Sequence, residues 1–124
     1  MIRVLVVDDS VPFLAAATEV IVAADGFELA GVVQGGEEGI ELARISRPDL
    51  ALVDLNMPGL DGNETVARLA TACPETVTVL MTATPDPSRK SNGLFDKRKL
   101  SPASLREIWA RTQASRAVGM TRRP

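Results

Sequence analysis

Reactive side chains follow the apolar stretches of this sequence, each close to the point where a stretch ends. In chain order they are two adjacent carboxylates, a third carboxylate, a hydroxyl and an amine: Asp8 and Asp9, Asp54, Thr82, and Lys97. In an open parallel sheet the carboxyl ends of the strands share one edge, and ligands bind there. If the stretches are such strands, these side chains meet at that edge.

Carboxylates gathered in one crevice repel one another, and a divalent cation removes that repulsion. Oxygen ligands without a nearby histidine or cysteine favour Mg²⁺, with Mn²⁺ as the alternative, over zinc. Because Mg²⁺ keeps coordination positions for phosphate oxygens, the acidic set favours phosphoryl chemistry. Asp54 would be the acceptor, since carboxylates form aspartyl phosphates. Thr82 and Lys97 would bind the phosphoryl oxygens.

Asp54 taken alone has a second interpretation. It ends the apolar run 50–54 and precedes a turn that contains Pro58 and Gly59. An aspartate in that place can simply hydrogen-bond the backbone of its own turn. The reactive side chains at the ends of the other stretches favour the phosphate acceptor.

The composition limits the chemistry of the chain. Its 124 residues include no histidine and a single cysteine, Cys73. The chain therefore holds no phosphohistidine and no histidine-assisted serine or cysteine nucleophile. It also lacks the residues for a disulfide framework or a zinc cluster, which favours a reducing cytoplasm. The length of 124 residues predicts a single domain. The apolar stretch 11–24 is interrupted by Glu19 and is shorter than the roughly 20 residues that span a membrane.

Charge is distributed unevenly along the chain. Residues 1–75 contain 13 acidic and 4 basic side chains, whereas residues 76–124 contain 3 acidic and 10 basic ones. A basic second half can serve an acidic partner or a nucleic acid. We expect folding to interleave the two halves and so to reduce this asymmetry. We do not expect direct nucleic-acid binding, because no aromatic residues alternate with the basic ones to stack on bases.

Apolar runs alternate with stretches of helical periodicity. Strands are predicted at 2–7, 28–33, 50–54, 77–81 and 94–96, and helices at 11–24, 37–45, 66–73 and from 102 onward. Ser101 and Pro102 are typical of a helix start. The alternation predicts a doubly wound parallel α/β sheet with right-handed crossovers.

With these residues the sequence resembles the receiver domain of two-component response regulators. The matching segments are Val4-Leu5-Val6-Val7-Asp8-Asp9-Ser10, Pro48-Asp49-Leu50-Ala51-Leu52-Val53-Asp54-Leu55-Asn56-Met57-Pro58-Gly59-Leu60-Asp61-Gly62, Met81-Thr82-Ala83, and Lys97. The resemblance covers nearly the whole chain. It implies a flavodoxin-like fold, with a doubly wound five-stranded parallel sheet in the order 2-1-3-4-5.

The resemblance also implies a role for each site residue. The implied metal ligands are Asp8, Asp9, Asp54 and the backbone carbonyl of Asn56, with Asp8 acting through a water. The groups implied around the phosphoryl group are Thr82 and Lys97, with Asn56 and Thr84 beside the path of the hydrolytic water. The phosphoryl donor would be the phosphohistidine of a sensor histidine kinase or of a histidine phosphotransfer protein. The domain would catalyse its own phosphorylation and dephosphorylation and would not be a stand-alone metabolic enzyme.

The sequence departs from the usual receiver pattern in three places. Residues 82–93, between the fourth and fifth strands, include two prolines and a glycine but no large apolar residue. They predict that the fourth helix of the family is missing or much shortened. Leu94 stands where the family commonly has an aromatic residue, and Arg98 stands where a proline usually follows the lysine.

We therefore expect a receiver domain at residues 1–118, with residues 119–124 as a tail or linker stub. It would signal by changing its association with a downstream protein or with a second copy. The alternative is a receiver-like protein-interaction module that phosphorylation does not switch.

Overall fold

The computed structural model describes residues 1–84 and 94–121, and side chains up to residue 116. Within these residues lie five strands, four α-helices and one 3₁₀ helix, η1. The strands are β1 (Ile2–Val7), β2 (Phe27–Val33), β3 (Leu50–Asp54), β4 (Val77–Thr82) and β5 (Leu94–Asp96). The helices are α1 (Val11–Ala23), α2 (Gly36–Ser46), α3 (Gly62–Ala72), η1 (Lys97–Lys99) and α4 (Pro102–Thr121). The predicted elements are confirmed, most of them to within one or two residues at each end.

The strands form one parallel sheet in the order β2-β1-β3-β4-β5. This order confirms the predicted doubly wound α/β fold. The central strand β3 is buried along its whole length, as expected for an apolar run covered on both faces. The outer strands β2 and β5 form the two edges of the sheet.

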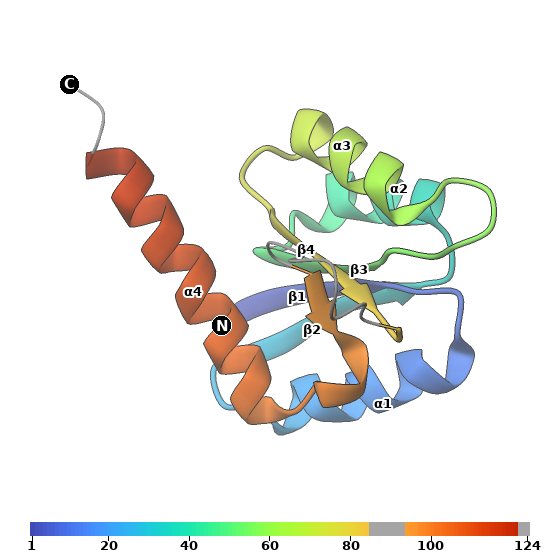
Figure 1. Ribbon diagram of the computed structural model, residues 1–124, viewed down its shortest axis with the longest axis horizontal. Helices are drawn as coiled ribbons and strands as arrows, with labels where there is room; N and C mark the ends of the chain where they lie inside the picture. The colour runs from blue at the N-terminus through green and yellow to red at the C-terminus, as the bar shows by residue number, and fades with distance from the viewer. Residues whose placement is uncertain (85–93, 122–124) are drawn as a thin grey trace.

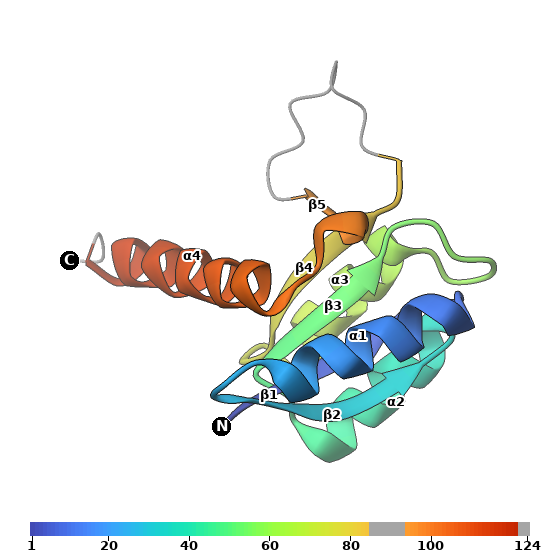
Figure 2. The same ribbon diagram turned by 90° about the horizontal axis from the view of Figure 1, so that it is seen from below.

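Helices cover both faces of the sheet and divide the apolar interior into two clusters (Figures 1 and 2). On one face, α1 and α4 bury residues such as Leu14, Ile21 and Leu105 against alternate positions of the strands. On the other face, α2 and α3 bury Ile40 and Leu69. Successive strand residues point to opposite faces, so each strand contributes to both clusters.

Two helix starts hold the loops at the carboxyl edge of the sheet. Ser10 caps α1, where its hydroxyl accepts a hydrogen bond from the Phe13 N–H at 3.3 Å. Asp61 caps α3 in the same way and accepts from the Glu64 N–H at 2.9 Å. Such caps satisfy N–H groups that the helix itself leaves without partners. The chain is thereby fixed just after β1 and a few residues after β3.

Helix α4 packs only part of its length on the domain. Leu105 and Ile108 are buried near its start, whereas most of the side chains at 110–116 are exposed. Figures 1 and 2 show its far part extending away from the sheet. Exposed basic side chains lie along η1 and α4, namely Arg98, Lys99, Arg106, Arg111 and Arg116. The expected interleaving of charge is therefore incomplete, and a basic flank remains.

Two expectations concern the later part of the chain. The missing fourth helix falls mainly on residues 85–93, which lie outside the described residues; of its neighbours, residues 83 and 84 are not helical. α4 continues as helix past Gly119 to Thr121, and the expected domain boundary at residue 118 stays a prediction. A single glycine lowers helix stability by only about 1 kcal/mol, so neighbouring residues can carry the helix through it.

Candidate functional site

Three carboxylates meet at the carboxyl edge of the sheet. The parallel register pairs Val7 with Val53, so Asp8, the next residue after β1, comes beside Asp54 at the end of β3. One oxygen from each of Asp8, Asp9 and Asp54 lies within 4.8 Å of the others. Asp8 and Asp54 are buried, whereas Asp9 is exposed. The expected convergence of these side chains is confirmed.

Asp54 is held by close backbone contacts. A Cβ atom at Gly62 would stand 2.3 Å from the carbonyl oxygen of Asp54 and 2.6 Å from Cα of Leu55. The Gly62 N–H also donates a hydrogen bond to the Leu55 carbonyl at 3.0 Å. Only glycine permits this approach of α3 to the end of β3. The first residue of α3 thus fixes the backbone that carries the carboxylate.

The environment of Asp54 disfavours its charged form. Burial raises the pKa of its carboxyl group above the ordinary value of 3.8, and the nearby Asp8 carboxylate adds to the rise. Lys97 and the backbone N–H of Asn56 act in the opposite direction, and Asp9 adds a smaller increase. The net direction is upward, because desolvation and like charge outweigh these two favourable partners.

Asp8 uses both of its carboxylate oxygens. Oδ1 accepts a hydrogen bond from the Ser10 N–H at 2.8 Å, and Oδ2 accepts one from Lys97 Nζ at 2.7 Å. The side chain is fully buried. A buried carboxylate requires such partners, because an unpaired charge in the interior is strongly unfavourable. Asp8 is therefore paired with the lysine in this structure.

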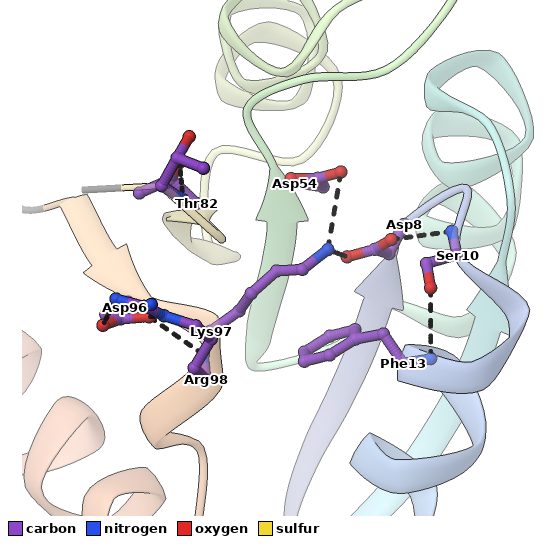
Figure 3. Close-up of polar contacts among 9 residues, drawn as sticks. Asp8, Ser10, Phe13, Asp54, Thr82, Asp96, Lys97 and Arg98 are labelled. Atoms are coloured by element: carbon purple, nitrogen blue, oxygen red, sulfur yellow. Dashed lines mark hydrogen bonds and ion pairs between the residues drawn. The ribbon is translucent and has the colours of Figure 1, made fainter. Parts of the chain in front are cut away.

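Lys97 reaches across the site from the end of β5 (Figure 3). Its ammonium nitrogen is 2.7 Å from Asp8 and 3.8 Å from Asp54, and the side chain is only 13% exposed. The same nitrogen lies 4.6 Å from the centre of the Phe13 ring. A cation at this distance from an aromatic face is attracted by the ring. Two carboxylates and one ring thus hold the amine within the acidic cluster.

Thr82 ends β4, the strand beside β3, so Thr82, Asp54 and Asp8 follow one another along the sheet edge (Figure 3). Its buried hydroxyl accepts a hydrogen bond from the Thr84 N–H at 3.2 Å. A hydroxyl that accepts one hydrogen bond still has its proton to donate. Asn56, two residues after Asp54, has an exposed side chain. The roles of these residues toward a phosphoryl group stay predictions.

The acidic cluster suits a divalent cation. Its carboxylate oxygens lie within 4.8 Å of one another, and burial together with the nearby Asp8 carboxylate raises the pKa of Asp54. A bound Mg²⁺ or Mn²⁺ would neutralise the repulsion between the carboxylates. Because both oxygens of Asp8 already have partners, Asp54 and the exposed Asp9 are the readier ligands.

Four residues of the site were not predicted from the sequence. Ser10 bonds Asp8 and caps α1, Phe13 lies against Lys97, and Asp96 and Arg98 bond each other on either side of that lysine. Ser10 had a signal, because a serine before a helix is a typical cap. The contacts of the other three depend on how η1 turns and where α1 lies, and the sequence pattern does not specify either.

Comparison with known proteins agrees with the fold. A family model for the response regulator receiver domain matches residues 4–96. The chain therefore belongs to the response regulator receiver domain family.

Individual relatives extend this comparison. The protein-glutamate methylesterase/protein-glutamine glutaminase 2 of Anaeromyxobacter dehalogenans is 43% identical over 84 residues, which are 68% of this chain and 24% of that protein. The response regulator domain of Thermotoga maritima CheB has a TM-score of 0.70 at 22% identity and covers 100% of this chain and 99% of its own. A chain of the CheX-CheY-BeF3-Mg²⁺ complex from Borrelia burgdorferi has a TM-score of 0.74 at 19% identity, covering 89% of this chain and 87% of that one. The two solved structures support the fold.

The chain spans about a quarter to two fifths of the length of the first curated relatives that it matches.

None of the helices in the described residues has the length and apolar character that crossing a membrane requires.

Proposed function

We propose that this receiver accepts a phosphoryl group on Asp54 in the presence of Mg²⁺. The observation that carries the proposal is the acidic cluster of Asp8, Asp9 and Asp54 with the amine of Lys97 between two of its members. An anionic acceptor, oxygen ligands for a cation and a fixed positive charge are the parts that phosphoryl transfer requires. The donor would be the phosphohistidine of a sensor histidine kinase or of a histidine phosphotransfer protein, because this chain has no histidine of its own.

In the transfer step, a carboxylate oxygen of Asp54 forms a bond to phosphorus. The phosphorus–nitrogen bond of the donor breaks, and its electron pair stays on the imidazole. Lys97 and Thr82 stabilise the charge on the phosphoryl oxygens, the lysine as a cation and the threonine as a hydroxyl donor. Lys97 is already beside the acceptor, 3.8 Å from an Asp54 oxygen.

Dephosphorylation would break the bond between the Asp54 oxygen and phosphorus. A water oxygen attacks phosphorus, the bond to the Asp54 oxygen breaks, and its electron pair returns to the carboxylate. The protons of the water leave with inorganic phosphate and the solvent. Asn56 and Thr84, both exposed, would flank the path of this water.

The metal site would consist of Asp9, Asp54 and the backbone carbonyl of Asn56, with Asp8 linked through a water. When bound, Mg²⁺ would neutralise phosphoryl oxygens and reduce their repulsion by the carboxylates. Other residues of this chain position the carboxylates. Ser10 and Lys97 hold Asp8 in place, and Gly62 lets the backbone of Asp54 approach α3.

The output of phosphorylation would be a change in protein association. The binding partner would be a downstream protein or a second copy of the chain, and the surface would include β5 and α4. Direct nucleic-acid binding and membrane binding are not part of the proposal. We place the receiver domain at residues 1–118, with residues 119–124 as a tail or linker stub that continues α4 as far as Thr121.

The experiment supplies an acyl phosphate and Mg²⁺ to the purified chain and follows acid-labile phosphoprotein, with Asp54→Asn as the control. We expect phosphate on the parent chain and none on the variant. Absence of phosphate on the parent would refute the acceptor role. Phosphorylation without any change in oligomeric state or partner binding would favour the alternative, an interaction module that phosphorylation does not switch.

A further inference from the structure

The short turn that carries Lys97 is closed by its two flanking residues. Arg98 donates three hydrogen bonds to the Asp96 carboxylate: its backbone N–H and Nε each bond Oδ1 at 3.0 Å, and Nη2 bonds Oδ2 at 2.9 Å. Lys97 lies between these two residues in the chain. We call this pair, Asp96 with Arg98, the clasp.

The turn has few other supports: Phe95 and Leu100 pack against the core, and the Ser104 hydroxyl donates a hydrogen bond to the Lys99 carbonyl at 2.9 Å. β5 is only three residues long and lies at the edge of the sheet, where it pairs with β4 alone. The following 3₁₀ helix is also three residues long, and its closing bond, from the Leu100 N–H to the Lys97 carbonyl, measures 3.3 Å. A proline at residue 98 would fix the backbone dihedral there, but arginine leaves it free. Hydrogen bonds within the turn therefore add rigidity that the backbone of residue 98 does not supply.

The geometry of the clasp matches this task. Asp96 is paired with Thr82 of β4, so its backbone is held in the sheet, and its side chain is only 12% exposed. A bidentate arginine–carboxylate pair has a well-defined orientation. The hydrogen bonds from the arginine side chain hold the pKa of the Asp96 carboxyl below its usual range.

We propose that Asp96 and Arg98 are positioning residues that hold Lys97 at the acidic cluster. This inference rests on the proposed function for its effect on phosphoryl transfer, but the position of the amine can be measured without it. Lys97 must extend from an edge strand to reach Asp8 at 2.7 Å and Asp54 at 3.8 Å. If the clasp opens, the turn gains freedom and the amine spends less time between the two carboxylates.

The first measurement is NMR of the lysine side-chain amines in the unphosphorylated protein. The chain has only three lysines, Lys90, Lys97 and Lys99, so their signals can be assigned by substitution. The Lys97 amine should exchange slowly and be shifted from the exposed Lys99 amine, because it is hydrogen-bonded and nearly buried. In Arg98→Gln and in Asp96→Asn the Lys97 signal should move toward that of Lys99.

The second measurement is the rate of phosphorylation by an acyl phosphate with Mg²⁺. Exposed ion pairs have small coupling energies, so each variant should react about three- to five-fold more slowly, and the double variant no more slowly than either. Arg98→Lys should recover part of the rate, since an ammonium can still pair with Asp96. Arg111→Gln is the matched control: Arg111, like Arg98, is an exposed arginine paired with a carboxylate, Glu107 at 2.8 Å, but it lies on α4 away from the lysine.

An unchanged Lys97 amine signal in both clasp variants would overturn the proposal. So would equal slowing by Arg111→Gln, or a melting temperature that falls in parallel with the rate, since either would indicate a general loss of stability. If the parent chain accepts no phosphate at all, the proposed function fails, and the NMR result alone decides whether the clasp positions Lys97.

Discussion

The amine of Lys97 is bonded to Asp8, which it approaches to 2.7 Å, and not to the candidate acceptor Asp54, from which it stands 3.8 Å away. Asp8 is fully buried and needs this positive partner. In the unmodified protein, the lysine therefore stabilises the folded site itself. A metal ion that binds the cluster would share that task.

Replacing Lys97 by glutamine should accordingly destabilise the protein. The change leaves the buried Asp8 beside Asp54 without a positive charge, and breaking a buried pair reduces stability by about 3 kcal/mol. Mg²⁺ should restore more stability to Lys97→Gln than it adds to the parent, because the ion replaces the missing charge. Chemical denaturation with and without Mg²⁺ measures both effects. Lys99→Gln, at an exposed residue, is the control and should change stability by less than about 0.5 kcal/mol.

Replacing Asp54 by asparagine should stabilise the protein at neutral pH. A carboxyl group whose pKa is raised in the folded state binds its proton more tightly there than in the unfolded chain. Its ionisation therefore lowers stability as the pH rises from 3.8 through the raised pKa, and the loss is complete above that value. The gain from the asparagine should be about 1 kcal/mol near pH 7.5 and should shrink toward about pH 4.5. Melting temperatures at the two pH values test this; a gain that stays constant with pH would contradict it.

Magnesium should raise the melting temperature through Asp9. At ten times its dissociation constant, a ligand that binds only the folded state adds about 1.4 kcal/mol. Asp9 is exposed, so Asp9→Asn should leave the metal-free protein nearly as stable as the parent and remove most of the response to Mg²⁺. Asp25→Asn changes another exposed aspartate outside the cluster and should retain the response. An equal response in both variants would exclude Asp9 as a ligand.

Adding a methyl group at Gly62 should displace the backbone of Asp54 and Leu55. The new Cβ would stand 2.3 Å from the Asp54 carbonyl oxygen, so the backbone must move. We expect Gly62→Ala to reduce stability by about 1 to 3 kcal/mol and to weaken Mg²⁺ binding as well. Gly35→Ser is the comparison, because a Cβ there meets only the flexible Glu38 side chain, at 3.5 Å, and serine suits a helix cap. Unchanged metal affinity in Gly62→Ala would argue against this backbone coupling.

Most of the fold could be predicted from the sequence because local and global signals agree. Continuous apolar runs such as 50–54 indicate strands buried on both faces, and the strand order followed from the family resemblance. The end of α4 could not be predicted, because a late glycine and a polar composition suggested fraying while helix propagation carried the chain to Thr121. The expected mixing of charges was also incomplete, since α4 extends from one flank (Figure 1).

The members of the site could be predicted better than their contacts. The chain positions of Asp8, Asp9 and Asp54 at strand ends were enough to bring them together, because parallel strands share their carboxyl edge. Lys97 lies 2.7 Å from Asp8 but 3.8 Å from Asp54, and this difference of about an ångström is set by side-chain packing. The clasp was missed for the same reason: Asp96 and Arg98 are two residues apart, and only the 3₁₀ turn brings them into contact.

The partly unsupported α4 has a mechanical consequence. Its 20 residues form a rod about 30 Å long, whose buried residues Leu105 and Ile108 lie near one end. That end follows η1 directly, with only Leu100 and Ser101 between Lys99 and Pro102. A tilt of about 10° around it would carry the opposite end through about 5 Å. A small rearrangement beside Lys97 that tilted α4 would therefore displace the far end of the helix by several ångströms.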